Sequence, residues 1–109
     1  MCRHSKEKGE ARARALSGAS DVRFVAADLT RVGDCRSVIA ATDAHFGRVD
    51  VLVNAAAMTD RGTLLDTNHE RFDRLFATNV RVPFFLMQEA VAVMRRKRTE
   101  EGPPVIFNI

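Results

Sequence analysis

The sequence predicts an open α/β fold in which buried parallel strands alternate with helices, joined by right-handed crossovers. Short and nearly continuous apolar runs at residues 22–28, 49–53 and 105–109 are typical of strands that are covered on both faces. Between these runs, apolar residues recur at steps of three and four, which is the helical spacing. The 109 residues, 46% hydrophobic and 28% charged, are predicted to form one domain with no second domain.

The first predicted element is a helix at residues 5–17. Ser5 is its expected N-cap and Gly18 its expected stop. Its apolar face is thin and consists mostly of Ala11, Ala15 and Leu16.

A strand and a second helix are predicted next. The strand at residues 22–28 ends on Asp28. Thr30 is the expected cap of the helix, and Gly47 is expected to end it. The apolar stripe of this helix contains Val32, Cys35, Ile39, Thr42 and Phe46.

A second buried strand at residues 49–53 leads into a short run of small residues and a polar loop. Thr67 and Glu70 form an expected capping box for a long helix over residues 72–94. A Gly-Pro-Pro turn then introduces the last predicted strand, at residues 105–109. The inward stripe of the long helix reads Phe72, Phe76, Asn79, Pro83, Leu86, Met87, Ala90 and Met94.

Asn79 is the polar exception on that apolar stripe. Pro83 lies four residues later and has no N–H, so the carbonyl of Asn79 loses its usual helical partner and the helix is expected to kink. One interpretation is that Asn79 holds a water or a reacting group. The other is that it satisfies a neighbouring backbone group at the kink.

Two further polar residues stand at predicted strand ends. Asp28 and Asn54 follow neighbouring strands, and ligands of open α/β sheets bind beyond the carboxyl ends of the strands. Taken singly, each residue is better interpreted as a turn or cap residue. Two such positions in one chain keep the ligand interpretation open.

The charge pattern gives little support for a nucleic-acid partner. The net charge is +3, and a basic cluster covers residues 95–98. The chain has no Trp and no Tyr, and no aromatic residue interleaves the basic clusters to stack on bases. We interpret residues 95–98 as the solvated end of a helix, where the helix dipole favours basic side chains. Binding to DNA or RNA with a steep salt dependence is the reading that remains as an alternative.

Several other classes of site are not indicated. No run of about 18 apolar residues exists that could span a bilayer, and the first ten residues are too charged for a signal peptide, so a cytoplasmic location is expected. Cys2 and Cys35 form no metal or redox pair and are expected to be free and reduced. The histidines lack metal spacing, and the glycines form no phosphate-binding loop.

Four stretches, taken together and in order, resemble a known family. They are "ADLT" at residues 27–30, "GRVDVLVNAAA" at 47–57, "FDRLFATNVRVPFFLMQEAVAVM" at 72–94 and "PPVIFNI" at 103–109. The sequence is similar to the middle of a short-chain dehydrogenase/reductase, a Rossmann-fold oxidoreductase that uses a nicotinamide cofactor. The resemblance implies a Rossmann-like, doubly wound parallel sheet to which this chain contributes strands 3, 4 and 5 and the intervening helices.

The resemblance also implies roles for residues at the strand ends. Asp28 and Leu29 would hold the adenine ring of the cofactor. Asn54, Ala55 and Ala56 would form the turn beside the cofactor, although Ala55 stands where the family has a second asparagine.

Two more roles follow from the same resemblance. The main-chain carbonyl of Asn79 would bind a water that relays protons to the catalytic lysine, which agrees with a carbonyl freed by Pro83. Arg3 would lie near the end of the second strand, where a basic residue favours the 2′-phosphate of NADP over NAD. NADP is therefore the expected cofactor, with NAD as the alternative.

The resemblance implies a homo-oligomeric enzyme that moves hydride between nicotinamide and a small carbonyl or secondary-alcohol substrate. The family's glycine-rich loop and Tyr-x-x-x-Lys motif do not occur in these 109 residues. In the family's strand order, the strand at residues 22–28 would have no neighbour. We therefore expect the chain to fold poorly and to be inactive on its own. The alternative is a non-catalytic interaction protein that associates with a full-length paralogue through its long helix.

Overall fold

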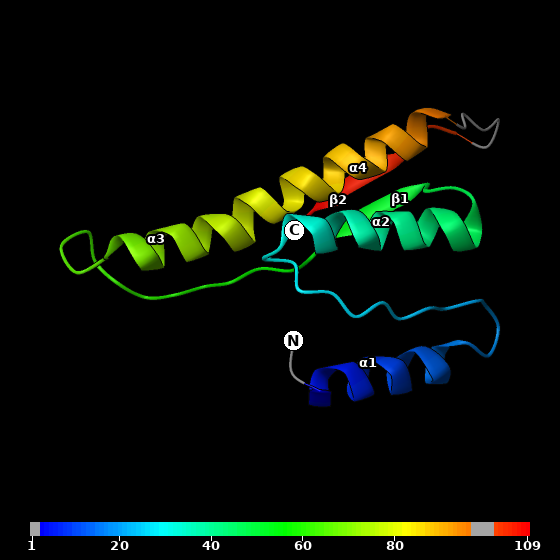
Figure 1. Ribbon diagram of the computed structural model, residues 1–109, viewed down its shortest axis with the longest axis horizontal. Helices are drawn as coiled ribbons and strands as arrows, with labels where there is room; N and C mark the ends of the chain where they lie inside the picture. Colours follow the sequence, from blue (N-terminus) through cyan, green and yellow to red (C-terminus); the bar gives the residue numbers. More distant parts are fainter. Residues whose placement is uncertain (1–2, 97–101) are drawn as a thin grey trace.

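The computed structural model describes residues 3–96 and 102–109 and shows an α/β chain with a small parallel sheet (Figure 1). Cys2 and the end of the basic cluster, residues 97 and 98, lie outside the described residues. None of the described helices is long and apolar enough to cross a membrane. The elements in chain order are α1 (Arg3–Leu16), α2 (Val32–Phe46), β1 (Val51–Asn54), α3 (His69–Phe76), the π-helical turn η1 (Ala77–Arg81), α4 (Val82–Arg96) and β2 (Val105–Asn108).

The sheet consists of β1 and β2, which pair in parallel with Val51 opposite Val105 and Asn54 opposite Asn108. The two strands confirm the apolar runs predicted at residues 49–53 and 105–109, although β1 begins two residues later than expected. Only one face of the sheet is covered by the described residues. Val51, Val53 and Phe107 are more than half exposed on the other face, so the prediction that both faces are covered is wrong here.

The strand predicted at residues 22–28 is not formed. This segment is extended, but it joins no β-ladder with any residue that the structure describes. An apolar run becomes a strand only when a neighbour accepts its backbone hydrogen bonds, and this segment lies apart from β1 and β2 (Figure 1). It is instead tied to α2 at both ends, where Asp21 contacts His45 and the N–H of Asp28 donates to Asp34.

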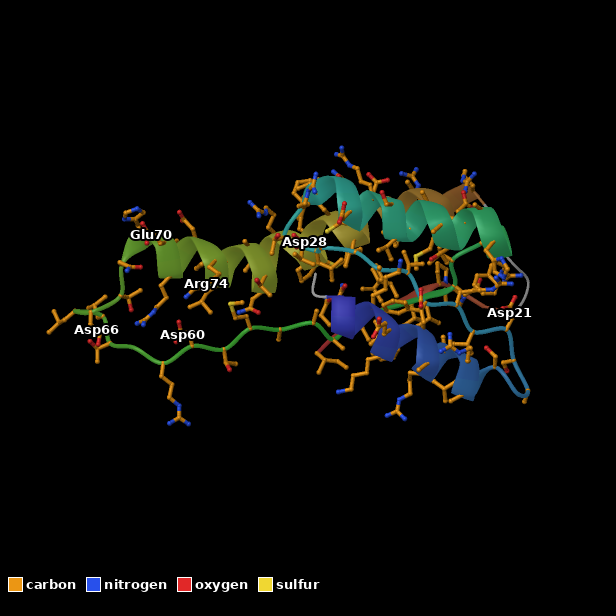
Figure 2. The ribbon with its side chains drawn as sticks, turned by 60° about the horizontal axis from the view of Figure 1, so that its bottom comes forward. Asp21, Asp28, Asp60, Asp66, Glu70 and Arg74 are labelled. Atoms are coloured by element: carbon orange, nitrogen blue, oxygen red, sulfur yellow. The ribbon has the colours of Figure 1, made fainter. Side chains whose placement is uncertain are left out.

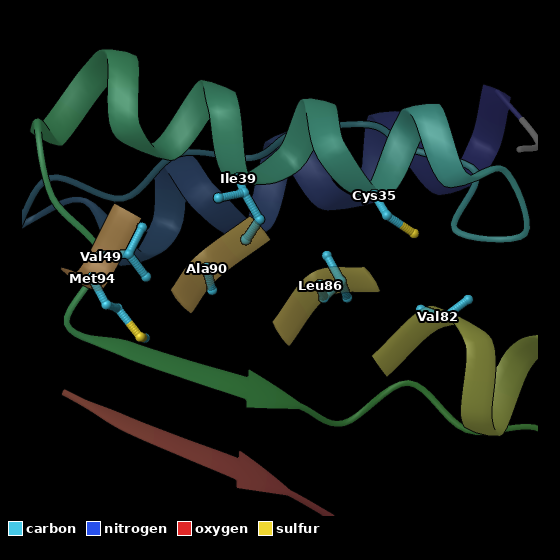
Figure 3. Packing of buried hydrophobic residues seen from close by; sticks show 7 residues of the cluster. All are labelled: Cys35, Ile39, Val49, Val82, Leu86, Ala90 and Met94. Carbon is cyan, nitrogen blue, oxygen red and sulfur yellow. The ribbon is translucent and has the colours of Figure 1, made fainter. Parts of the chain in front are cut away.

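The core lies between α2, α4 and the inner face of the sheet (Figure 3). Ala90 is fully buried, and a small residue at that position lets α2 and α4 approach closely. Leu52 and Ile106 of the two strands pack against this cluster from the sheet. The buried apolar members are Cys35, Ile39, Val49, Val82, Leu86, Ala90 and Met94.

Helix α1 packs outside this core. It begins at Arg3, so Ser5 lies within its first turn and is not the N-cap, because neither Arg3 nor His4 resists helical geometry. The thin apolar face remains largely in solvent, and Leu16 is 60% exposed. Gly9 faces the ring of Phe24, and any side chain on Gly9 would collide with that ring. The helix therefore rests on the extended segment rather than on the core.

Helix α2 confirms the predicted stripe at its buried centre, Cys35 and Ile39, and ends at Gly47 as predicted. Gly47 has a φ of 74°, and its N–H donates to the carbonyl of Asp43 at 2.7 Å. The cap residue at the other end is Arg31, not Thr30, and it makes no side-chain capping bond. The hydroxyl of Thr30 binds Asp28 instead, which removes it from the helix end.

We expect Gly47→Ala to lower the free energy of unfolding by about 1–2 kcal/mol, because residues other than glycine are strained at positive φ. Gly33→Ala is the matched control, since a methyl group there meets no atom within 4 Å and helical alanine is favoured over glycine. Urea titration in trimethylamine N-oxide, which favours the folded state, followed by far-UV circular dichroism measures both. Equal shifts of the two variants in the same direction would contradict the assignment of Gly47 as the left-handed helix end.

The long helix is formed by α3, η1 and α4 in series. Asn68 caps its start by accepting a hydrogen bond from the N–H of Arg71 at 2.8 Å, so the predicted capping box with Thr67 as cap is wrong. The hydroxyl of Thr67 donates to the carbonyl of Thr63 instead. Only the second half of the predicted stripe is buried. Phe72 and Phe76 are about half exposed because α3 extends beyond the core, as Figure 1 shows.

The resulting shape is elongated, with extents of 52 × 32 × 22 Å and a radius of gyration of 16.1 Å. A compact domain of this length has a radius of gyration of about 13 Å. The excess reflects α3 and its loop, which project from the core, and α1, which lies outside it (Figure 1).

Candidate functional site

The carboxyl ends of β1 and β2 bring two asparagine side chains together. Asn54 is 7% exposed, and its amide Nδ2 donates to Oδ1 of Asn108 at 2.8 Å. The carbonyl of Asn54 also accepts a hydrogen bond from the N–H of Ile109 at 3.0 Å. Both hydrogen bonds of Asn54 therefore hold the carboxyl ends of the two strands together.

An open groove of about 430 Å³ lies beyond this end of the sheet. Asn54, Ala56 and Asn79 all line it, and Pro83 and Met87 form part of its helical wall. Its volume lies within the range of small-molecule sites, about 300–1,000 Å³. The structure therefore brings together three of the predicted site residues at the place where open α/β sheets bind ligands.

Asn79 lies in the π-helical turn, at the place where the loss of normal helical hydrogen bonding and a kink were predicted. The N–H of Val82 donates to the carbonyl of Ala77, five residues earlier, and this replaces the normal α-helical pattern just before Pro83. A wider turn is the response expected when a proline cannot donate to the carbonyl four residues before it.

The side chain of Asn79 binds the loop that follows β1. Its Oδ1 accepts from the N–H of Met58 at 2.9 Å, and its Nδ2 donates to the carbonyl of Met58 at 2.8 Å. This is the second of the two interpretations that the sequence left open, in which the side chain satisfies a neighbouring backbone. The catalytic role, which concerns the main-chain carbonyl of Asn79, stays a prediction.

The same loop is also held along α3 by charged groups. Arg71 lies 3.1 Å from Asp60 and 3.7 Å from Asp66, and Arg74 lies 3.4 Å from Asp60. Figure 2 shows Asp60 and Asp66 on the loop below α3, with Arg74 on the helix above them. These pairs are partly exposed and individually weak, but several of them fix one loop to one helix.

Asp28 and Leu29 lie in a tight turn before α2 and do not line the groove. The Asp28 carboxylate accepts hydrogen bonds from the Thr30 hydroxyl at 2.6 Å and from the Thr30 N–H at 3.0 Å. Leu29 is half-buried against the core, and its carbonyl accepts from the thiol of Cys35. The Asp28 side chain thus has a turn role in this structure, and the adenine role stays a prediction.

The hydrogen bonds from Thr30, first from its hydroxyl and then from its N–H, hold the pKa of Asp28 below its usual range. Because its pKa is lowered, Asp28 stabilises this turn at pH values above its pKa in the unfolded chain, and that stabilisation is lost as the pH falls through its pKa in the folded chain.

We expect Thr30→Val to raise the titration midpoint of Asp28 toward its ordinary value in a carboxyl ¹³C NMR titration. Thr78→Val is the control, since Thr78 makes no hydrogen bond to a carboxylate in the described part of the chain. An Asp28 midpoint that Thr30→Val leaves in place would contradict this origin of the shift.

The remaining predicted residues are spread more widely. Ala55 is exposed and does not line the groove. Arg3 is the first residue of α1, and its proposed contact with a 2′-phosphate stays a prediction. Asn108 lines the groove but was not singled out from the sequence. The rule that selected Asn54, a polar residue at the end of a buried strand, applies to Asn108 as well and would have found it.

Cysteine and histidine side chains show no second site in the described residues. Cys35 is a free, buried cysteine, and burial raises the pKa of its thiol. Within residues 3–96 and 102–109, no group of three or more His, Cys, Asp or Glu side chains is placed to hold a metal ion. Arg95 and Arg96 end α4, and Arg96 pairs with Asp43 of α2.

Comparisons with known proteins agree on one family. A family model described as enoyl-(acyl carrier protein) reductase matches residues 1–105. An uncharacterized oxidoreductase of Thermotoga maritima is 33% identical over 106 residues, which cover 96% of this chain and 40% of that protein.

Solved structures give the same result. A short-chain dehydrogenase/reductase of Serratia marcescens has a TM-score of 0.76 at 30% identity, over 81% of this chain and 36% of that one. The Pseudomonas aeruginosa RhlG/NADP active-site complex has a TM-score of 0.79 at 25% identity, over 91% of this chain and 39% of that one. The chain thus spans about two fifths or less of the length of these relatives. With the family-model match, the sequence identity and the fold in agreement, the chain belongs to the short-chain dehydrogenase/reductase family.

Proposed function

We propose that residues 1–109 are part of the dinucleotide-binding domain of an NAD(P)-dependent oxidoreductase. The whole enzyme would move hydride between the nicotinamide and a small carbonyl or secondary-alcohol substrate, as a homo-oligomer in the cytoplasm. The observation that carries this proposal is the groove at the carboxyl ends of two parallel strands, bordered by Asn54, Ala56 and Asn79. Membership of a family of dehydrogenases and reductases supports the class of reaction.

The residues present fit one border of a dinucleotide site. The groove offers small side chains at Ala56 and Ala57, which allow close approach, together with amide groups for hydrogen bonding. A bound nicotinamide would supply the hydride chemistry. Within this chain, Ala55 and Ala56 would complete the cofactor-side turn that Asn54 fastens to the sheet. The carbonyl of Asn79 would hold a water for proton relay.

Two other contacts would belong to the far end of the cofactor. Asp28 and Leu29 would border the adenine, and Arg3 would favour the 2′-phosphate. NADP is therefore the preferred cofactor, with NAD as the alternative, and the NADP named in the Pseudomonas complex supports the nicotinamide class. The 109 residues hold no glycine-rich phosphate loop and no tyrosine to act as acid or base, so we propose that the chain by itself is inactive.

The genomic DNA on both sides of the coding sequence tests this proposal. Translation in every frame is expected to show a glycine-rich phosphate loop upstream and Tyr-x-x-x-Lys downstream of the region that encodes these residues. If neither motif is encoded in any frame on either side, the chain is not part of a complete oxidoreductase, and the proposal fails.

A second candidate function is supported by an exposed apolar face on the long helix. Phe72, Phe76, Val80 and Phe84 recur at four-residue steps and are each 51–54% exposed. The rings of Phe72 and Phe76 stack with centroids 4.4 Å apart, and an open groove of about 500 Å³ runs beside Phe76 and Phe84. A row of exposed phenylalanines is typical of a surface that binds another protein. We propose that this face docks on a full-length paralogue as a non-catalytic partner.

Size-exclusion chromatography with light scattering tests this second function, using the chain and a purified full-length family member from the same organism. Phe76→Asp is expected to abolish the complex. Leu16→Asp, which changes an exposed apolar residue on α1, is expected to preserve it. A monodisperse monomer that never co-elutes with the paralogue would rule the candidate out.

A further inference from the structure

The π-helical turn η1 contacts both of the loops that carry predicted cofactor residues. Asn79 binds the backbone of Met58, in the loop that continues from Asn54. Arg81, two residues later, donates from Nη2 to the carbonyl of Thr30 at 2.9 Å, in the turn that contains Asp28 and Leu29. Residues two apart on a helix point to roughly opposite sides, so one short turn reaches both loops at once.

The contacts of the 28–31 turn show what Arg81 adds. The Asp28 carboxylate binds Thr30, the carbonyl of Asp28 accepts from the N–H of Arg31, and Asp34 accepts from the N–H of Asp28. The thiol of Cys35 donates to the carbonyl of Leu29. All of these partners belong to the turn itself or to the first turn of α2.

Among the described residues, the hydrogen bond from Arg81 is the polar contact that links this turn to the long helix, 51 positions away in sequence. Figure 2 shows Asp28 at the start of α2, where that helix passes the long helix.

An arginine is well suited to this task. Its guanidinium is always charged and carries five N–H donors, and a hydrogen bond from a charged donor to a carbonyl is stronger than a neutral one. Ordering an exposed arginine side chain costs conformational entropy. The hydrogen bond from Arg81 to the carbonyl of Thr30 offsets that cost. Thr30 has its N–H and hydroxyl committed to Asp28, which leaves its carbonyl for Arg81.

We propose that Arg81 is a positioning residue for the adenine end of the cofactor, and that η1 fixes the two cofactor loops relative to each other. Arg81 holds the turn of Asp28 and Leu29, while Asn79 holds the loop after Asn54. The proposal rests on the proposed function, since the two loops matter to a ligand only if the cofactor spans them. It assigns the π-helical turn a role at both ends of the site.

The first readout needs no ligand. The full chain, labelled with ¹⁵N, is studied by NMR relaxation in trimethylamine N-oxide, which favours the compact state. Arg81→Gln is expected to lower the amide order parameters at residues 29–31 from about 0.85, typical of a rigid backbone, to below about 0.6, and to leave residues 57–59 unchanged. Asn79→Ala is expected to do the reverse.

Arg95→Gln is the matched control. It removes the same charge from the same long helix, at a residue with no hydrogen bond or ion pair to either loop in the described part of the chain. Order parameters at residues 29–31 that are equal in Arg81→Gln and Arg95→Gln would overturn the proposal. An undispersed spectrum of the unchanged chain in the osmolyte would overturn it as well, because the contacts of η1 with the two loops would then not form.

The second readout separates positioning from a merely structural role. Adenosine 5′-monophosphate is titrated to millimolar concentration and followed through the amide shifts of residues 28–30. We expect Arg81→Gln to weaken binding about tenfold, and the matched control Arg95→Gln to leave it unchanged.

The two readouts distinguish the failure of each idea. If the amide signals of the unchanged chain do not shift with the nucleotide, the proposed adenine site fails. Lowered order parameters at residues 29–31 in Arg81→Gln would then show that Arg81 restrains the turn only structurally. If the unchanged chain and the Arg81→Gln variant bind the nucleotide equally, the adenine site stands and the positioning role of Arg81 is wrong.

Discussion

Leu86→Ala is expected to abolish the cooperative folding of the chain. Leu86 lies in the buried cluster between α2 and α4, beside the fully buried Ala90. Removing a buried leucine side chain costs about 2–5 kcal/mol through lost burial and the cavity left behind. A domain of this length has a free energy of unfolding of about 5–15 kcal/mol, and a chain with one small core lies at or below the lower end of that range.

The measurement is a far-UV circular dichroism melt in trimethylamine N-oxide, with Leu16→Ala as the matched control. Leu16→Ala removes the same atoms from a side chain that is 60% exposed, so it is expected to leave the melt nearly unchanged. A Leu86→Ala variant that melts as the control does would show that the helices do not pack through this cluster in solution.

NADPH is expected to show no saturable binding to the chain at micromolar concentrations. The sequence lacks a glycine-rich loop to bind the phosphates. Among the described residues, one face of the sheet is uncovered and the 22–28 segment has no strand neighbour. NADPH fluorescence measures the binding, and the full-length Pseudomonas aeruginosa RhlG, whose solved complex contains NADP, is the positive control. In buffer without osmolyte, the far-UV melt of the chain is expected to be broad.

Micromolar, saturable NADPH binding together with a cooperative melt would reverse this conclusion. The chain would then be a self-sufficient cofactor-binding unit, and the groove beside Asn54 and Asn79 would be the place to map the bound nucleotide by amide shifts.

Helices with strong local signals were predictable from the sequence. The apolar stripe of α2 and the left-handed glycine that ends it depend on neighbours a few residues away, so periodicity located them. The disturbed helical hydrogen bonding before Pro83 was predictable for the same reason, since a missing N–H acts on the carbonyl four residues earlier. The caps were shifted because Thr30 and Thr67 have local alternatives, binding Asp28 and Thr63 respectively.

The 22–28 segment shows what a local pattern cannot decide. An apolar run reports that side chains prefer burial, but a strand also needs a partner for its backbone, and that partner is a property of the whole sheet. The same limit applies to the phenylalanines of α3. Their helical spacing predicted an inward face, yet α3 extends past the core, so Phe72 and Phe76 face solvent.

The candidate site was predictable in outline and less so in contact detail. Polar residues at strand ends led to Asn54, and the proline spacing led to Asn79; both line the groove. The pairing of Asn54 with Asn108 spans 54 positions, and the contact between Arg81 and Thr30 spans 51. Neither contact produces a periodic pattern in the sequence, because each depends on how the chain crosses over from one strand to the next.

The parallel register of β1 and β2 also sets the order in which the chain can fold. Each residue of β1 pairs with a residue 54 positions later, so a long loop must close before the first ladder bond forms. Local helices form within about a microsecond, whereas such distant pairings are slow. Early in folding, β1 is therefore an unpaired apolar strand that other molecules can capture. Protein concentration during refolding, as much as the contacts in the finished structure, decides whether β1 meets β2 or aggregates.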